Sequence, residues 1–240
     1  MISIKPLASG SSGNCYYISD GKSSLLLDAG ISIKDIRIGT GFKVSSLAGC
    51  LITHRHGDHS KAVSDLVKCG VDVYAPEDVF AALKLSSHRC KRLECGIVGG
   101  RAEKWTEIGS FRVLPFDVHH DVPNLGYYIH SKHTGENVLY FTDTYYLEYT
   151  FPGLHYVLAE CNYDPDVVDE NMTSGALPAG FKKRLVKSHM SIQTLIDTLK
   201  ANDLSEIKQI HLLHLSDRNS RETEFRDRIR AEVGCEVYVC

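Results

Sequence analysis

The 240-residue sequence lacks the features that would place it in or across a membrane. Its apolar runs are short, and none approaches the roughly 18 residues that a membrane-spanning helix needs. The first residues, MISIKPLASGSSGN, contain no basic stretch followed by an apolar core, so we expect no secretory leader. The sequence therefore predicts a cytoplasmic protein that does not associate with membranes.

The sequence also lacks an excess of charge of one sign. It carries 27 Lys and Arg residues against 30 Asp and Glu residues, which gives a formal net charge of -3 at pH 7. A net-acidic chain is not expected to coat nucleic acid through general basicity, although a local basic patch can still bind it.

Closely paired cysteines are missing as well. The eight cysteines are scattered, and no two form a CxxC pair, so we expect reduced thiols rather than a disulfide framework. The sequence has no repeat, no low-complexity tract and no long linker, while 43% of its residues are hydrophobic. We therefore expect one domain that spans residues 1–240.

What the sequence does contain is a succession of short apolar runs bounded by Gly, Asp and Ser. The predicted strands cover residues 16–18, 25–27, 51–53, 71–74, 111–115, 125–130, 138–142, 156–161, 208–213 and 236–240. The predicted helices cover residues 62–69, 76–85, 192–199 and 222–231. Ser191 is the expected N-cap of the third helix. This order favours the α/β class with an αββα sandwich, in which two sheets pack face to face with helices outside. Residues 162–187 carry Pro, Gly and Asn, and we expect a lid or an excursion there.

Three histidines and one aspartate follow the predicted strand 51–53 within six residues. They are His54, His56, Asp58 and His59. Imidazoles and a carboxylate so close together are costly to desolvate without a partner, and a divalent cation supplies one. Because residues two apart in an extended segment point the same way, His54 and His56 can bind one ion. Asp58 and His59 lie past the turn and can address a second ion.

This segment, THRHGDH, resembles the HxHxDH motif of the metallo-β-lactamase superfamily, and the other motifs of that superfamily follow in order along nearly the whole chain. The resemblance implies the αββα fold, a metal-dependent hydrolase and two divalent metal ions. Zn and Mn suit these ligands equally well.

The remaining motifs assign the other site residues by resemblance. LLLDAG implies that Asp28 lies behind the site and orients its ligands. VHHD supplies a histidine ligand, YFTDT implies that Asp143 bridges the two ions, and LHLS implies that His214 completes the second site. One ion would then be bound by His54, His56 and His120, and the other by Asp58, His59 and His214.

Two of these assignments leave an alternative open. His119 and His120 point to opposite faces if their strand continues, so only one of them is the ligand; the family pattern selects the residue before the acidic one, which is His120. Asp143 could instead be a turn aspartate, because Asp-Thr suits a turn.

Further segments resemble a narrower group, the YycJ/WalJ-type subfamily. They are LASGSSGN at residues 7–14, ECNYD at 160–164, SHMS at 188–191 and HLSDRN at 214–219. Tyr163, Ser188, Met190 and Ser220 depart from the subfamily pattern, which puts the substrate in more doubt than the chemistry. The resemblance implies a 5′-to-3′ DNA exonuclease, so the expected partner is nucleic acid, DNA rather than RNA. The sequence predicts no oligomeric state.

We expect two residues to be catalytic: Asp58, which is also a predicted metal ligand, and His189. The subfamily resemblance places His189 near the scissile phosphate, where it would donate a hydrogen bond or a proton to the leaving oxygen. A histidine that merely lies on the surface near the helix cap is the alternative.

Substrate contacts are expected from two stretches and one amide. The loop that contains Ser11 and Asn14 can form an anion-binding nest, although an ordinary hairpin turn would look the same. Asn162 lies in the ECNYD segment. The basic run before His189 supplies Lys182, Lys183, Arg184 and Lys187, which can guide phosphates or form a solvated face. The alternative function is a small-molecule hydrolase acting on a thioester, lactone, lactam or cyclic phosphate, since the same ions would serve it.

Overall fold

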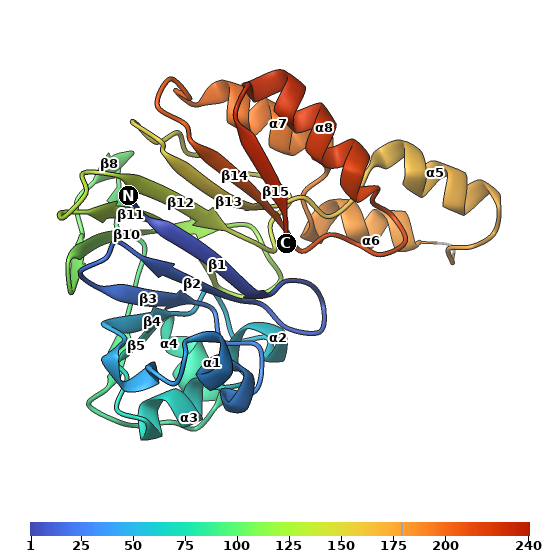
Figure 1. The fold of residues 1–240 in the computed structure, drawn as a ribbon. Helices are drawn as coiled ribbons and strands as arrows, with labels where there is room; N and C mark the ends of the chain where they lie inside the picture. Colours follow the sequence, from blue (N-terminus) through green and yellow to red (C-terminus); the bar gives the residue numbers. More distant parts are fainter. Residues whose placement is uncertain (179) are drawn as a thin grey trace. The chain divides into compact units, whose positions relative to one another are not determined.

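Strands alternate with short helices along this computed structural model, which describes residues 1–178 and 180–240 (Figure 1). The chain is divided into two units. Unit 1 comprises Met1–Asp117 and Val122–Glu136, and unit 2 comprises Val118–Asp121 and Asn137–Cys240. The single domain expected over residues 1–240 stays a prediction.

The first sheet of unit 1 has the strand order β1-β2-β3-β4-β5-β6. Its strands are β1 (Ser3–Ala8), β2 (Cys15–Ser19), β3 (Ser24–Leu27), β4 (Gly49–Leu51), β5 (Val73–Ala75) and β6 (Cys90–Arg92). β1, β2 and β3 pair antiparallel, whereas β3 to β6 pair in parallel. Leu27 of β3 pairs with Leu51 of β4, so these two strands end at the same edge of the sheet. That edge carries the residues that follow them, Asp28 and the His54 segment.

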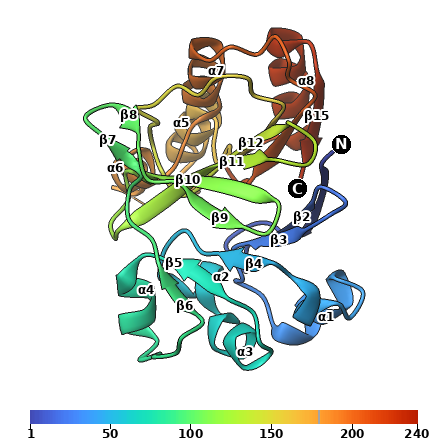
Figure 2. The same ribbon diagram turned by 90° about the vertical axis from the view of Figure 1, so that its left-hand side faces the viewer.

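Helices cover one face of this sheet, as Figure 2 shows for α1, α3 and α4. The helices of unit 1 are α1 (Ile33–Gly39), the 3-10 turn η1 (Val44–Ser46), α2 (Gly57–Ser60), α3 (Val63–Lys68) and α4 (Glu77–Ala82). Ile36, Leu66 and Phe80 pack from three of these helices into one core with Leu26 and Val73 of the sheet. The helices therefore bury the apolar face that the strand sequences predict.

Further strands of unit 1 follow β6. They are β7 (Ile97–Val98), β8 (Arg101–Ala102), β9 (Thr106–Ile108), β10 (Phe111–Val118, whose last residue starts a segment of unit 2) and β11 (Asn124–Ser131). β7 and β8 form a small antiparallel pair. β9, β10 and β11 are neighbours in this order, and Phe116 and Tyr127 on them are fully buried.

Within its described residues, unit 2 contains four parallel strands, of which the first three are nearly completely buried and the last is an edge strand with one buried residue. They are β12 (Asn137–Phe141), β13 (Tyr156–Glu160), β14 (Gln209–Leu213) and β15 (Glu236–Val239). α7 (Ile192–Ala201) and α8 (Glu222–Val233) lie side by side on this sheet (Figure 1). Because the strands are parallel, their carboxyl ends meet at one edge. Asp143, Glu160 and His214 lie at this edge, at the ends of β12, β13 and β14.

Most of the predicted elements are confirmed, including the cap of α7, where Ser191 accepts a hydrogen bond from the Thr194 amide. The predicted strand 51–53 is wrong at both ends, since β4 covers Gly49–Leu51. It stops there because the Thr53 amide donates to the Asp28 carboxylate at 2.8 Å instead of to a neighbouring strand.

The region 162–187 contains two helices that the sequence did not predict, α5 (Pro165–Thr173) and α6 (Phe181–Ser188). α5 begins in the usual way, with Asp164 as an N-cap that accepts from the Asp166 amide and with Pro165 at the first position. In the part of the chain that the structure describes, the cysteines are free. None of the helices described is long and apolar enough to cross a bilayer.

Candidate metal centre

In unit 1, four candidate ligands gather at the edge where β4 ends. The Nε2 atom of His54 lies 3.0 Å from Nδ1 of His56, and Nε2 of His59 lies 3.4 Å from Oδ2 of Asp58. The ring centroids of His54 and His59 are 4.3 Å apart. α2 begins directly after His56, and its turn brings Asp58 and His59 back toward the first two histidines. The structure thus groups the four residues that the motif predicts.

Asp28 orients this cluster from behind. It follows β3 in the left-handed conformation with φ 58°, and its carboxylate accepts hydrogen bonds from the Thr53 amide and hydroxyl. It also lies 2.7 Å from Nδ1 of His59, and all three residues are fully buried. Since a carboxylate can only accept, Nδ1 of His59 carries the proton, and Nε2 is left as the lone pair that a metal needs.

The loop over residues 9–14 packs against the same residues. Asn14 is fully buried, its Oδ1 accepts from the Gly10 amide, and its Nδ2 lies 3.0 Å from Nε2 of His59. A Cβ on Gly30 would lie 1.6 Å from the Asp58 carbonyl oxygen, so only glycine lets these backbones approach. Ser11 is exposed at the tip of the loop. Asn14 therefore holds the loop and the ligand histidine, while Ser11 is the residue that a solute can reach.

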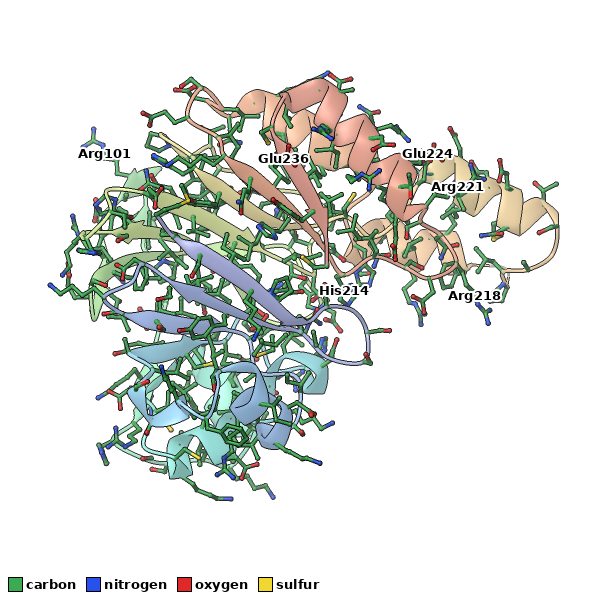
Figure 3. The ribbon with its side chains drawn as sticks, in the orientation of Figure 1. Arg101, His214, Arg218, Arg221, Glu224 and Glu236 are labelled. Carbon is green, nitrogen blue, oxygen red and sulfur yellow. The ribbon has the colours of Figure 1, made fainter. Side chains whose placement is uncertain are left out.

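In unit 2, a second cluster lies where β12, β13 and β14 end. Donor atoms of Asp143, Glu160, His189 and His214 all lie within 4.8 Å of one another. Asp143 and His214 follow their strands with φ 51° and 53°, and Figure 3 shows the labelled His214 at the end of β14. Left-handed backbone is uncommon outside glycine and concentrates at functional sites. Together with Asp28, the motif residues account for three of the five such positions in the described residues.

Glu160 is the hub of this second cluster. Its Oε1 atom lies 2.5 Å from Nδ1 of His189 and 3.4 Å from Nδ1 of His214, and its Oε2 atom accepts from the Thr144 amide at 3.1 Å. Glu160 lies in the ECNYD segment, but its residue type and position in the sequence predict no role for it. The only signal in the sequence was its place near the end of the predicted strand 156–161; that this strand lies between two others that end in site residues is known only from the structure.

The charges of this cluster stabilise one another. Burial alone would raise the pKa of Glu160, but His189, through its charge and hydrogen bond, and then His214 outweigh this effect and lower it. Burial alone would lower the pKa of His189, but the Glu160 carboxylate and then Asp143 raise it to about 9. Burial alone would also lower the pKa of His214, but Asp143 and Glu160 raise it above its usual value.

The two adjacent histidines of VHHD lie in different surroundings. The side chain of His120 is only 6% exposed, with Nε2 3.0 Å from the Asp121 carboxylate. The side chain of His119 is 41% exposed, and its Nε2 lies 2.8 Å from Glu148. The buried position of His120 favours it as the ligand, as the family pattern predicts.

The predicted substrate contacts of unit 2 are divided between surface and interior. Lys183, Arg184 and Lys187 are exposed on α6, which ends at His189, whereas Lys182 pairs with Asp169. Asn162 is buried, and its Nδ2 donates to the His214 carbonyl at 2.8 Å. Its amide thus holds a predicted ligand, and the prediction that it also contacts substrate stays a prediction.

The donor set fits a divalent transition-metal ion. Two nitrogens bound at about 2.0–2.1 Å in tetrahedral geometry lie about 3.3 Å apart. The 3.0 Å that separates the ring nitrogens of His54 and His56 is close to that spacing. Imidazole nitrogens and carboxylate oxygens are the ligands that zinc and manganese take in hydrolytic sites.

A family model described as the β-lactamase superfamily domain matches residues 24–215. The chain belongs to this family. The exodeoxyribonuclease WalJ of Streptococcus pneumoniae serotype 2 is 31% identical over 224 residues, which cover 89% of this chain and 81% of the relative. The exodeoxyribonuclease YycJ of Bacillus anthracis is 28% identical over 227 residues, covering 90% and 83%.

The metallo-β-lactamase fold protein YhfI of Bacillus subtilis superimposes with a TM-score of 0.74 over 100% of this chain and 97% of its own, at 16% identity. That likeness shows the fold alone. The predicted family and the predicted α/β fold class are therefore confirmed, and the chain is a metal-dependent hydrolase.

Proposed function

We propose that the chain is a metal-dependent nuclease that removes nucleotides from the 5′ end of DNA. One observation carries the nuclease part: a helix with exposed basic residues ends at a histidine that lies within a buried cluster of candidate metal ligands. The names of the two curated relatives, both exodeoxyribonucleases, support DNA as the substrate.

The proposal includes two divalent ions, Zn or Mn, in the ligand sets predicted from the motifs. The first set is His54, His56 and His120, and the second is Asp58, His59 and His214, with Asp143 shared. Two ions in such a site supply an acidified water and positive charge at the attacked phosphate. Asp28 holds His59 in the tautomer that binding requires.

Two side chains handle the protons in this proposal. Glu160 binds Nδ1 of His189, which leaves Nε2 to donate a proton to the leaving oxygen. Asp58, whose carboxylate side chain is 29% exposed, accepts a proton from the attacking water. A proton is thus taken up on the attacking side and returned on the leaving side.

Lys183, Arg184 and Lys187 supply the contacts to the DNA backbone. They are exposed on α6, and His189 directly follows that helix, so a phosphate chain bound along α6 leads to the proposed general acid. Such contacts are independent of base sequence, as an exonuclease requires.

Digestion of single- and double-stranded DNA and RNA, each labelled at the 5′ or the 3′ end, tests the proposal in the presence of Mn or Zn. We expect labelled mononucleotides to appear first from 5′-labelled DNA. His189→Ala should lower kcat by roughly 10²–10⁴-fold with little change in DNA affinity. If the metal-loaded protein cleaves no polynucleotide but hydrolyses a thioester or lactone, the alternative replaces this function.

A further inference from the structure

Two exposed tyrosines directly follow the bridging-ligand candidate Asp143. Tyr145 is 40% exposed and Tyr146 is 49% exposed. Single exposed rings are common on protein surfaces, so exposure alone does not make either ring a binding site, and a ring that stacks on a base must also be held in place. Tyr145 lies two residues after Asp143, so their Cα atoms are at most about 7 Å apart.

The ring of Tyr145 is held in place by a neighbouring side chain. It stacks on the imidazole of His119, with ring centroids 5.2 Å apart and an interplanar angle of 26°. His119 is held in turn by Glu148, whose carboxylate lies 2.8 Å from Nε2. Two flat side chains are thus fixed against each other while both remain partly open to solvent.

Thr144 connects this stack rigidly to the ligand cluster of unit 2. Its hydroxyl accepts from the His119 amide at 3.1 Å and donates to the Tyr146 carbonyl at 2.8 Å. Its amide donates to Glu160, the residue that binds His189. Thr144 is fully buried, so the stack has a fixed position relative to the proposed general acid.

We propose that the His119–Tyr145 stack is a platform on which one nucleobase of the DNA substrate stacks, next to the phosphodiester being cleaved. The inference rests on the nuclease function proposed above and adds how the strand end is positioned. Aromatic side chains bind bases through their faces, and this contact tolerates every base sequence. The bound base must be unpaired from the partner strand and unstacked from its neighbour, so the platform predicts a preference for single-stranded ends. Because purines have the larger stacking face, it also predicts a preference for purines over pyrimidines at that position.

The test combines Tyr145→Ala with substrates that carry one abasic site. Each end-labelled single-stranded oligonucleotide lacks the base at the terminal, second or third position, and KM and kcat are measured separately. With the complete oligonucleotide, Tyr145→Ala should raise KM about 5- to 150-fold, the usual range for one lost stacking contact. With the abasic site at the platform position, the wild type should lose the same factor and Tyr145→Ala should lose nothing more.

Matched variants separate stacking from other effects. Tyr145→Phe keeps an aromatic face and should retain the wild-type KM, whereas Tyr145→Leu should behave like Tyr145→Ala. His119→Ala, which removes the support of the ring, should give a smaller loss that the same abasic site abolishes. Tyr146→Ala changes an equally exposed ring of the same type and should have no base-dependent effect.

Three results would overturn the platform. One is an unchanged KM in Tyr145→Ala, and another is a loss that is the same on complete and abasic DNA. The third is an equal base-dependent loss in Tyr146→Ala. If the wild type cleaves DNA normally in these cases, the nuclease function stands and only the platform is wrong. If the wild type cleaves no polynucleotide at all, both proposals fall together.

Discussion

Replacing Asp28 by Asn should weaken metal binding without removing any candidate ligand. The carboxylate accepts from the Thr53 amide at 2.8 Å, from the Thr53 hydroxyl at 3.0 Å and from Nδ1 of His59 at 2.7 Å. An amide keeps one acceptor oxygen and adds an NH₂ group that can only donate. His59 then faces a donor, and its favoured tautomer moves the proton to Nε2, the atom that should bind the metal.

The losses of metal affinity and of unfolding free energy can both be estimated from the contacts that Asp28 makes. Loss of the partner that orients a ligand histidine typically costs 10- to 100-fold in metal affinity, so we expect the dissociation constant of Mn or Zn to rise by about that factor. A hydrogen bond to a charged group contributes about 1.5–3 kcal/mol, so the metal-free protein should lose about 2–3 kcal/mol of unfolding free energy. Competition with a chelator measures the first quantity, and urea denaturation measures the second.

Asp20→Asn is the matched control. Asp20 is also a buried aspartate of unit 1, and its carboxylate accepts from Ser110 at 2.6 Å and Ser131 at 2.7 Å. Burial would raise the pKa of Asp20, but these hydrogen bonds and those from nearby amides lower it. The control should therefore lose stability at neutral pH and keep its metal affinity. If Asp28→Asn binds metal as tightly as Asp20→Asn does, the orienting role of Asp28 is wrong.

Three more perturbations have defined outcomes. Asp143→Asn keeps a residue that tolerates the left-handed backbone, so it should fold like the wild type while DNA turnover, followed by gel assay, falls at least about 100-fold; wild-type turnover would remove Asp143 from the site. Burial lowers the pKa of His211 from its ordinary value of about 6.5 to about 4. Between these two pH values the unfolded chain therefore binds a proton at His211 that the folded chain does not. The unfolding free energy should thus fall by up to about 3 kcal/mol as the pH drops through this range, and His211→Gln should abolish the dependence; an unchanged slope in that variant would contradict the reasoning. Changing Lys183, Arg184 and Lys187 together to Gln should lower the slope of log affinity against log salt by about 0.7–0.9 per lost phosphate contact, and an unchanged slope would show that α6 does not bind the DNA backbone.

The parts of the fold that could be predicted are those whose signal is local. The strand ending at Leu27 and the one ending at Phe141 are short buried runs followed by aspartates, and each aspartate lies at the sheet edge that the pattern indicates. The first strand was missed because β1 is an exposed edge strand that carries Pro6 and an irregular register.

The role of Glu160 could not be predicted because it depends on long-range pairing. Glu160 pairs with Leu213 of β14, and only this register brings its carboxylate beside His214. α6 escaped prediction for a similar reason. Half of its residues are basic, and its N-cap is Gly180 at φ 87° without a side-chain hydrogen bond. Its Leu185 packs into a small cluster with Tyr163 and Val168. Tertiary packing, rather than helix propensity, therefore stabilises α6.

The central claim, a metal-dependent nuclease with two ions, is tested most directly by adding Mn back to chelator-treated protein. The initial rate of single-stranded DNA cleavage is measured against the molar ratio of Mn to chain, with the chain well above the dissociation constant. We expect no cleavage by the metal-free protein and a rate that rises until two equivalents are bound. Cleavage by the metal-free protein, or full activity at one equivalent, would contradict the account.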